Sequence, residues 1–157
     1  MLGREHALGH PALTDTATGM ANRLHFELVY SYLFHGADRG VPMALMLISV
    51  GSDEELPVES LRELGEIFQN VSRVADLSAH LGHGRFGVLL LGTNLMGGRV
   101  AADRFMDNLA GHTPGPVAVG LAGYTPDMKE PGQLLEAADA ALQRAQQGGG
   151  GVELAQQ

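Results

Sequence analysis

An apolar run from Met43 to Val50 constrains the fold more than any other feature of this sequence. Ser49 is its only polar residue, and no polar and apolar positions alternate along it. A short, nearly continuous apolar run of this kind is typical of a strand that is buried on both faces of a sheet. We therefore expect a layered domain in which 43–50 is a central strand.

Helical spacing precedes and follows this run. Apolar residues at intervals of four, Met20, Leu24, Leu28 and Tyr32, predict a long helix over 18–39. A second helix is predicted over 61–73 and a third after Asn94, a residue type that caps helices. A fourth begins at Pro131 and ends at the glycine run 148–151, which we interpret as the start of a linker.

The remaining apolar segments predict strands. Segments 77–81 and 86–91 flank the turn-forming residues 82–84 and indicate a β-hairpin, and 117–122 is a further strand. Segment 82–87 has the letters G-x-G-x-x-G, but it leads into a strand and not into a helix, which disfavours a dinucleotide site. The order predicts an α+β fold with a mostly antiparallel central sheet flanked by helices.

Composition excludes several classes of protein. The 157 residues fit one domain, and a formal net charge of -8 is unsuited to coating a nucleic acid. The absence of cysteine excludes disulfides and thiolate metal sites. No apolar run approaches the roughly 20 residues of a membrane helix, and no export signal is recognisable, so we expect a cytoplasmic protein without membrane insertion.

Two sets of polar residues near the hairpin have both a structural and a functional interpretation. His80 and His83 could be a metal pair, but they lack further ligands at a familiar spacing, which favours two surface histidines. Arg73 and Asp76 could form an exposed ion pair. They could instead recognise guanine, because an Arg fork donates to the O6/N7 edge while a carboxylate accepts from N1–H and N2–H.

Four segments together resemble the GGDEF domains of the diguanylate cyclase family. Residues 15–23 resemble the D-x-L-T-G-L-x-N-R motif of that family, and Arg73-x-x-Asp76 followed by 82–86 resembles the inhibitory R-x-x-D and the GG[D/E]EF signature. Segments 117–122 and 137–142 are similar to its V-S-I-G-V-A strand and its A-D-x-A-L-Y helix. The order and approximate spacing agree over nearly the whole chain.

The resemblance implies a nucleotide-cyclase palm with a βαββαβ core, in bacterial cyclic di-GMP signalling. Active members of the family join two GTP molecules with two Mg²⁺ ions held by carboxylates. Here the positions of the two metal aspartates fall on Ser49 and Gly51. The signature reads Gly82-His83-Gly84-Arg85-Phe86, so glycine and arginine replace its acidic pair.

The other positions that the resemblance assigns to the GTP site are also changed. Asp53 and Glu54 stand where Phe and the phosphate-binding Lys are expected, and Gln146 and Gly150 replace two basic residues. A replacement metal site at 53–55 is less expected than a solvated acidic loop. Because Arg85 brings positive charge to a cation site, we expect no catalysis, no Mg²⁺ and no other cofactor.

The inhibitory site, by contrast, keeps its residues. Arg73 and Asp76 have the family's spacing to the hairpin, and Arg104 falls where the family often has a second arginine. In the family this surface binds cyclic di-GMP. The sequence therefore predicts a non-catalytic receptor of cyclic di-GMP, and the alternative is a nucleotide-free domain for dimerisation or protein interaction.

The resemblance also sets the expected boundaries and partners. Residues 1–14 are a lead or linker, 15–152 the GGDEF-like domain, and 153–157 a tail or a linker to a following domain. Because such domains rarely work alone, we expect a protein partner or a covalently linked EAL phosphodiesterase or sensor domain. A homodimer is compatible with the sequence, and no nucleic-acid partner is expected.

Overall fold

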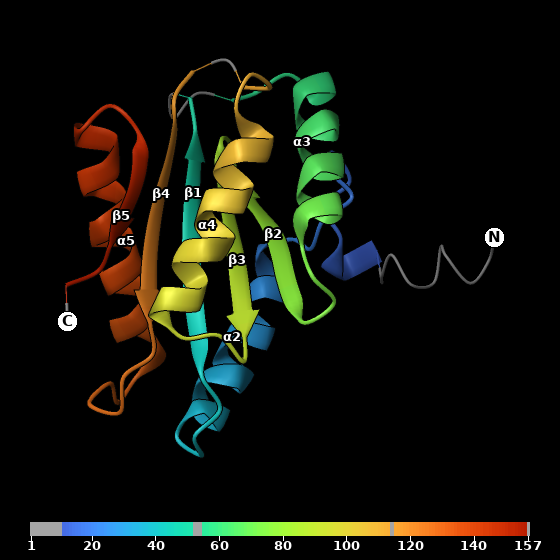
Figure 1. Ribbon diagram of the computed structural model, residues 1–157. Helices are drawn as coiled ribbons and strands as arrows, with labels where there is room; N and C mark the ends of the chain where they lie inside the picture. Colours follow the sequence, from blue (N-terminus) through green and yellow to red (C-terminus); the bar gives the residue numbers. More distant parts are fainter. Residues whose placement is uncertain (1–10, 52–54, 114, 157) are drawn as a thin grey trace.

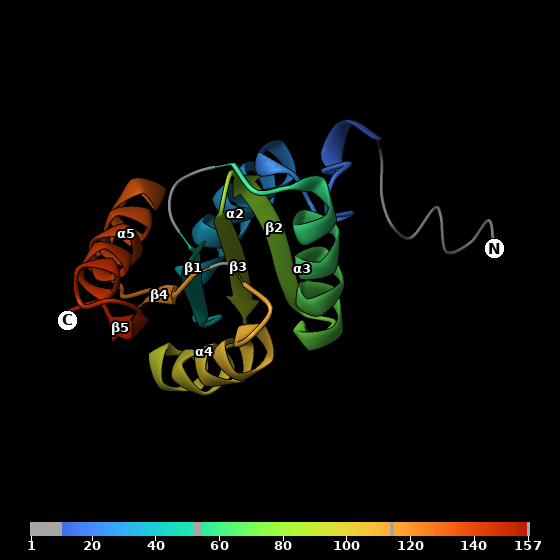
Figure 2. The same cartoon turned by 90° about the horizontal axis from the view of Figure 1, so that it is seen from above.

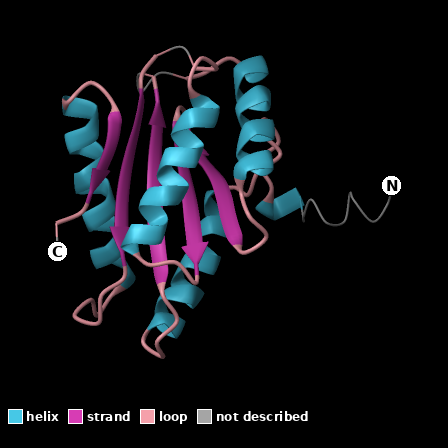
Figure 3. Cartoon of the chain, in the orientation of Figure 1, coloured by secondary structure: helices cyan, strands magenta, loops and turns pink. Residues whose placement is uncertain are grey.

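A five-stranded sheet forms the centre of the computed structural model, which describes residues 11–51, 55–113 and 115–156 (Figures 1 and 3). The strand order is β2-β3-β1-β4-β5. The strands are β1 (Met43–Val50), β2 (Asp76–Gly82), β3 (Arg85–Leu91), β4 (Val117–Gly123) and β5 (Gly151–Leu154). All neighbours pair antiparallel except β4 and β5, which are parallel, so the predicted α+β, mostly antiparallel sheet is confirmed.

The helices lie on both faces of this sheet. They are α2 (Arg23–Ala37), α3 (Val58–Val71), α4 (Leu95–Leu109) and α5 (Pro131–Gln147), after a short 3₁₀ turn η1 (Pro11–Leu13). Figure 2 shows α4 on one side of the sheet and α2 on the other. The segment from β1 to β4 has the predicted βαββαβ order. Within the described residues, no helix is both long and apolar enough to cross a membrane.

β1 is the central strand that the apolar run predicts. All of its residues are buried, and alternate side chains enter two separate hydrophobic cores. Met46 and Ile48 pack with α3 and α4, while Leu45 and Leu47 pack with α2 and α5. Burial on both faces explains why the sequence of β1 shows no alternation of polar and apolar residues.

The first helix is shorter than predicted and turns a different face to the sheet. Asp15 accepts hydrogen bonds from the amide and hydroxyl of Thr18, Gly19 has a φ of +76°, and Asn22 caps the helix, so α2 begins only at Arg23. Its buried residues are Phe26, Tyr30, Phe34 and Ala37. Of the four residues used to predict the helix, Met20 is buried but precedes α2, and Leu24, Leu28 and Tyr32 are 50%, 57% and 79% exposed.

The predicted linker at the glycine run is wrong. Gly149, Gly150 and Gly151 have φ values of +86°, +123° and +93°, which suit glycine and reverse the chain after α5. Residues 151–154 then pair with β4 as the edge strand β5. The sequence-predicted tail 153–157 therefore begins inside the sheet, and the predicted lead 1–14 includes η1 and a bridge from Thr14 to Ala21.

Candidate functional site

The β2–β3 hairpin and the turn before β2 lie at opposite ends of the sheet. In the β1–β3 register Met43 pairs with Leu91 and Ser49 with Arg85, while in the β2–β3 register Asp76 pairs with Leu90. Asp76 is thus at the Met43 end, and the signature residues are at the Ser49 end. At about 3.3 Å per residue the two ends are roughly 20 Å apart, and each end has its own surface cavity.

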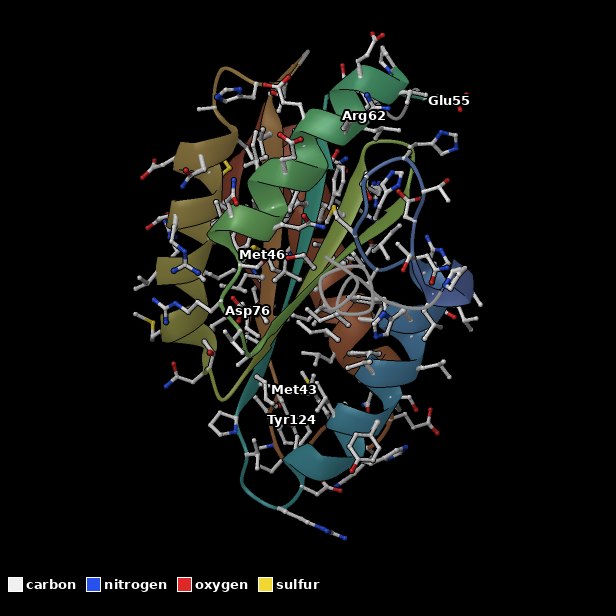
Figure 4. All side chains as sticks on the ribbon, turned by 90° about the vertical axis from the view of Figure 1, so that its right-hand side faces the viewer. Met43, Met46, Glu55, Arg62, Asp76 and Tyr124 are labelled. Atoms are coloured by element: carbon white, nitrogen blue, oxygen red, sulfur yellow. The ribbon has the colours of Figure 1, made fainter. Side chains whose placement is uncertain are left out.

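Arg73, Asp76 and Arg104 meet at a cavity of about 510 Å³ between the α3–β2 turn and α4. Arg73 stands in the turn just after α3 ends, and the first turn of α4 supplies Asn94 and Gly97 to the same cavity. In Figure 4, Asp76 lies on the side of the sheet that α4 covers, away from Glu55 and Arg62. The structure therefore brings together all three residues that the sequence predicts for this site.

Asp76 is held in place by the turn it terminates. Its side chain is only 5% exposed, and its Oδ2 accepts a hydrogen bond of 2.9 Å from the backbone N–H of Arg73. The Asp76 N–H in turn donates to the Arg73 carbonyl. No described residue donates a hydrogen bond to Oδ1 of this carboxylate. Asp76 thus has one oxygen in a structural role and a second that is left to accept from a ligand.

The two arginines retain donors without acceptors. Arg104 Nη2 lies 4.0 Å from Asp76 Oδ2, beyond hydrogen-bond distance, and this buried nitrogen has no hydrogen-bond partner among the described residues. Arg73 is exposed, and its guanidinium has neither a hydrogen bond nor an ion pair to any described residue. Because a guanidinium has five N–H donors and cannot lose its charge, the cavity has unused capacity for an anionic, acceptor-rich ligand.

Two of the predicted degenerate active-site positions, Ser49 and Gly51, line a second, smaller cavity of about 280 Å³, whereas the signature residues 82–86 do not. Ser49, Gly51, Gln146 and Gly150 line it, and none of the described residues in its lining is charged. Gln146 Nε2 donates to Ser49 Oγ over 3.0 Å, which links α5 to the end of β1. The two polar side chains of this cleft are therefore bonded to each other.

Arg85 lies beside α5 and is partly exposed. Its Nη1 lies 3.6 Å from Asp139 Oδ1, and both side chains line a third cavity together with Arg23. In the family such a position is acidic and holds a cation. Here a guanidinium already paired with a carboxylate occupies it, so an added cation would meet positive charge.

A magnesium ion does not fit the residues described at this end of the sheet. Magnesium requires oxygen ligands, usually including carboxylates, and the lining of the small cleft has none. Among the described residues, no group of three or more His, Asp or Glu is placed to hold a metal ion. Of the loop proposed as a replacement metal site, Asp53 and Glu54 lie outside the described residues.

The hairpin tip is positioned by a contact that sequence reasoning missed. Gly82 and His83 have positive φ values of 109° and 48°, so the chain reverses tightly before Gly84, and Phe86 packs behind it on Phe68. His80 is buried, with Nδ1 3.1 Å from Asp15 Oδ2 and Nε2 2.7 Å from the His83 carbonyl. The prediction of two surface histidines is therefore wrong for His80, which connects the turn before α2 to the hairpin.

Comparison with known proteins shows the fold at low sequence identity. No protein-family model matches the chain, and no curated protein matches it. The GGDEF domain of FimX from Pseudomonas aeruginosa superposes with a TM-score of 0.80 at 19% identity, covering 90% of this chain and 98% of that one. The GGDEF domain of DgcB from Caulobacter crescentus, solved in complex with c-di-GMP, gives 0.79 at 18% identity, covering 92% and 96%.

A third likeness is to a diguanylate cyclase that was solved with a partner protein. The diguanylate cyclase SiaD from Pseudomonas aeruginosa, solved in complex with its activator SiaC, gives a TM-score of 0.82 at 20% identity over 99% of this chain and 66% of that one. At these identities the likeness establishes that the chain has the fold of GGDEF domains. The fold is thus the one that the sequence resemblance implies.

Proposed function

We propose that this domain is a non-catalytic receptor of cyclic di-GMP, which it binds in the cavity of Arg73, Asp76 and Arg104. The observation that carries the proposal is the contrast in charge between the two ends of the sheet. Two guanidinium groups with unused donors and one open carboxylate oxygen meet at one end. At the other end, where GTP and metal would bind in a cyclase, the small cleft has no charged side chain in its described lining.

The chemistry of the cavity matches a guanine nucleotide. Arg73 is free to donate a bidentate pair to the O6/N7 edge of guanine or to a phosphate, while Asp76 Oδ1 accepts from the N1–H and N2–H groups. Arg104 Nη2 then gains the acceptor that it lacks. The first turn of α4 adds the positive end of a helix dipole to the same cavity, which favours phosphate.

Lack of catalysis is the second part of the proposal. The reaction needs carboxylates that hold Mg²⁺ against the triphosphate. The described cleft offers Ser49 and Gln146, whose polar atoms bind one another, and Arg85, which pairs with Asp139. No step through a metal can be derived from these residues, so the domain is expected to act by binding alone.

Calorimetric titration with cyclic di-GMP tests the proposal. The wild-type domain should bind, and Arg73→Ala should weaken binding at least about 100-fold, because charged hydrogen bonds contribute about 1.5–3 kcal/mol each. Arg73→Ala should not change the unfolding midpoint, since the Arg73 side chain has no partner among the described residues. GTP with Mg²⁺ should give neither a heat of reaction nor a cyclised product.

Arg99→Ala is the matched control. Arg99, like Arg73, is an exposed arginine. It lies on α4, pairs with Asp103 of the same helix and does not line the cavity. Its removal should leave the affinity unchanged. A folded wild-type domain that gives a flat trace would overturn the receptor function and favour the nucleotide-free interaction domain. Binding that survives Arg73→Ala would instead overturn the assignment of this cavity as the binding site.

A further inference from the structure

The outer face of α2 is apolar although it faces solvent. Leu24, Leu28 and Tyr32 point away from the sheet and are 50%, 57% and 79% exposed, while the opposite face of the helix is buried in the core. These three residues form a continuous stripe, because side chains four apart on a helix are neighbours. An exposed Leu-Leu-Tyr stripe of this kind indicates a surface that another molecule covers.

The solvent-facing side of α3 provides a comparison for the exposed face of α2. The exposed residues of α3 are almost all polar: Glu59, Arg62, Glu63, Glu66, Gln69 and Asn70. The exposed apolar residues of α2 are therefore not a general property of this surface. Met96 and Val100 of α4 are also exposed, but among the described helices only α2 has three exposed apolar residues in succession at the helical period.

The stripe is complementary to itself. Ser31, Glu27 and His35 are exposed on the same helix, and Ser31 stands midway between the other two. If a twofold axis passes through Ser31, an antiparallel copy places Glu27 level with the partner's His35, and the reverse pair forms at the other end. The spacing of Leu24, Leu28, Ser31 and His35 is four, three and four, which is the spacing of a helix–helix seam.

We propose that α2 pairs antiparallel with α2 of a second copy of this chain. In this isologous contact Ser31 is the small residue at the crossing point, and Leu28 and Tyr32 of each copy interdigitate around it. The Glu27 carboxylate, whose Oε1 lies 3.7 Å from Arg23 Nη1 of the same helix, also accepts a hydrogen bond from the partner's His35 imidazole. Because α2 and the nucleotide cavity lie on opposite sides of the sheet, the contact leaves the cavity open (Figure 2).

The contact should be weak and reversible. Stable protein interfaces bury roughly 800 Å² per partner, and one face of a fifteen-residue helix offers less. We therefore expect a monomer–dimer equilibrium that depends on concentration. A linked domain that raises the local concentration of the chain would strengthen it.

Sedimentation equilibrium up to about 1 mM protein tests the pairing, because this range includes weak association constants. The wild-type mass should rise with concentration from one chain to two, and Leu28→Glu should remain monomeric. Met96→Glu is the control, since Met96 is a 68% exposed residue of α4 and not of α2, and it should dimerise like the wild type. A wild-type chain that stays monomeric throughout, or equal loss of dimer in both variants, would overturn the proposal.

Disulfide trapping tests the register independently. The chain has no cysteine, so Ser31→Cys introduces a single thiol at the proposed twofold axis. Mild oxidation should link Ser31→Cys into a covalent dimer at least about tenfold faster than Met96→Cys, because geometry limits disulfide formation. Equal rates would contradict a twofold axis at Ser31. Both measurements are made without nucleotide, so their outcome does not depend on the proposed receptor function.

Charge exchange distinguishes the proposed pair from general apolar association. Glu27→Lys should weaken the dimer. The double variant Glu27→Lys/His35→Glu should restore it, because opposite charges then face each other again with their positions exchanged. Failure of the second substitution to restore association, in a folded double variant, would exclude this antiparallel register.

Discussion

The two ends of the sheet differ in how they use their polar groups. At the Asp76 end, Arg73 and Arg104 keep donors that no described residue accepts. At the Ser49 end, Ser49 bonds to Gln146 and Arg85 pairs with Asp139. Polar groups that satisfy one another hold the fold together, whereas polar groups left without partners in a cavity are available to a ligand.

The small cleft at the Ser49 end is hollow, with a volume of about 280 Å³. Its described lining includes an amide, a hydroxyl and glycine backbone, and no charged side chain. A triphosphate would bring several negative charges there without a cation to receive them, and burial of unpaired charge is costly.

The largest effect should follow from a change at Gly120, which seats α5 on β4 and so shapes the small cleft. A Cβ at Gly120 would lie 2.2 Å from Leu142 N and 2.3 Å from the Ala138 carbonyl, both backbone atoms. Gly120→Ala should therefore lower the free energy of unfolding by about 3 kcal/mol, measured by urea denaturation. Gly132→Ala, where nothing lies within 4 Å, is the control and should change it little.

Asp76→Asn should have a smaller effect, on nucleotide affinity. It tests whether one carboxylate oxygen holds the turn while the other binds the ligand. The asparagine carbonyl can still accept from the Arg73 N–H, so the unfolding midpoint should change little. The new NH₂ group meets the donors of guanine, and cyclic di-GMP should bind at least about tenfold more weakly. Calorimetry together with thermal unfolding checks both parts. Unchanged affinity would mean that Asp76 serves only the turn.

Arg85→Glu sharpens the comparison at the other end. The substitution places a carboxylate near Asp139 where an ion pair of 3.6 Å stands, and both side chains are about two-fifths exposed. Solvent screening limits the loss to about 0.5 kcal/mol in urea denaturation. The double variant Arg85→Glu/Asp139→Arg should recover this loss. Magnesium binding by Arg85→Glu alone would show that one residue blocks the metal site, which the account does not expect.

The smallest effect should come from a change beside Tyr124. This residue lines neither cavity, so it is a reference position at which nucleotide affinity should not change. Its hydroxyl donates to Asp38, and this hydrogen bond raises the pKa of Tyr124 above its ordinary value of 10.0. The folded state holds this proton more tightly than the unfolded state, so the contribution to stability is present below pH 10.0 and is lost at higher pH. In Asp38→Asn, ultraviolet titration should show one tyrosine ionising earlier, with nucleotide affinity unchanged.

The sequence predicted most of the sheet because its strands have strong local signals. β1 is apolar throughout, and the β2–β3 hairpin turns at glycines flanking His83. β5 could not be predicted in this way. Its four residues begin with the last glycine of the run and have no local strand pattern. They form a strand because they pair with the edge of β4, which is a tertiary effect.

The orientation of α2 was beyond the sequence for a different reason. Phe26, Tyr30 and Phe34 repeat at the same four-residue interval as Leu24, Leu28 and Tyr32, so the helix has two apolar faces. The period predicts a helix but does not say which face meets the sheet. The aromatic face is larger and stacks on itself and on Tyr124, which decides the packing.

For the candidate site, the family resemblance predicted which residues take part, and the structure showed which hydrogen bonds they form. The spacing of Arg73 and Asp76 and the position of Arg104 predicted which side chains meet. Neither predicted that Arg104 would retain an unsatisfied nitrogen, nor that Gln146 would bond to Ser49. Both facts depend on contacts between α4 or α5 and strands distant in sequence.

One nuclear magnetic resonance titration tests the contrast between the two ends directly. Backbone amide signals of the labelled domain are followed during addition of cyclic di-GMP. The account predicts shifts at Arg73, Asp76 and the first turn of α4, with the signals of Ser49, Gly149 and Gly150 unmoved. Shifts confined to Ser49 and the glycine turn would place the nucleotide in the neutral cleft and contradict the account.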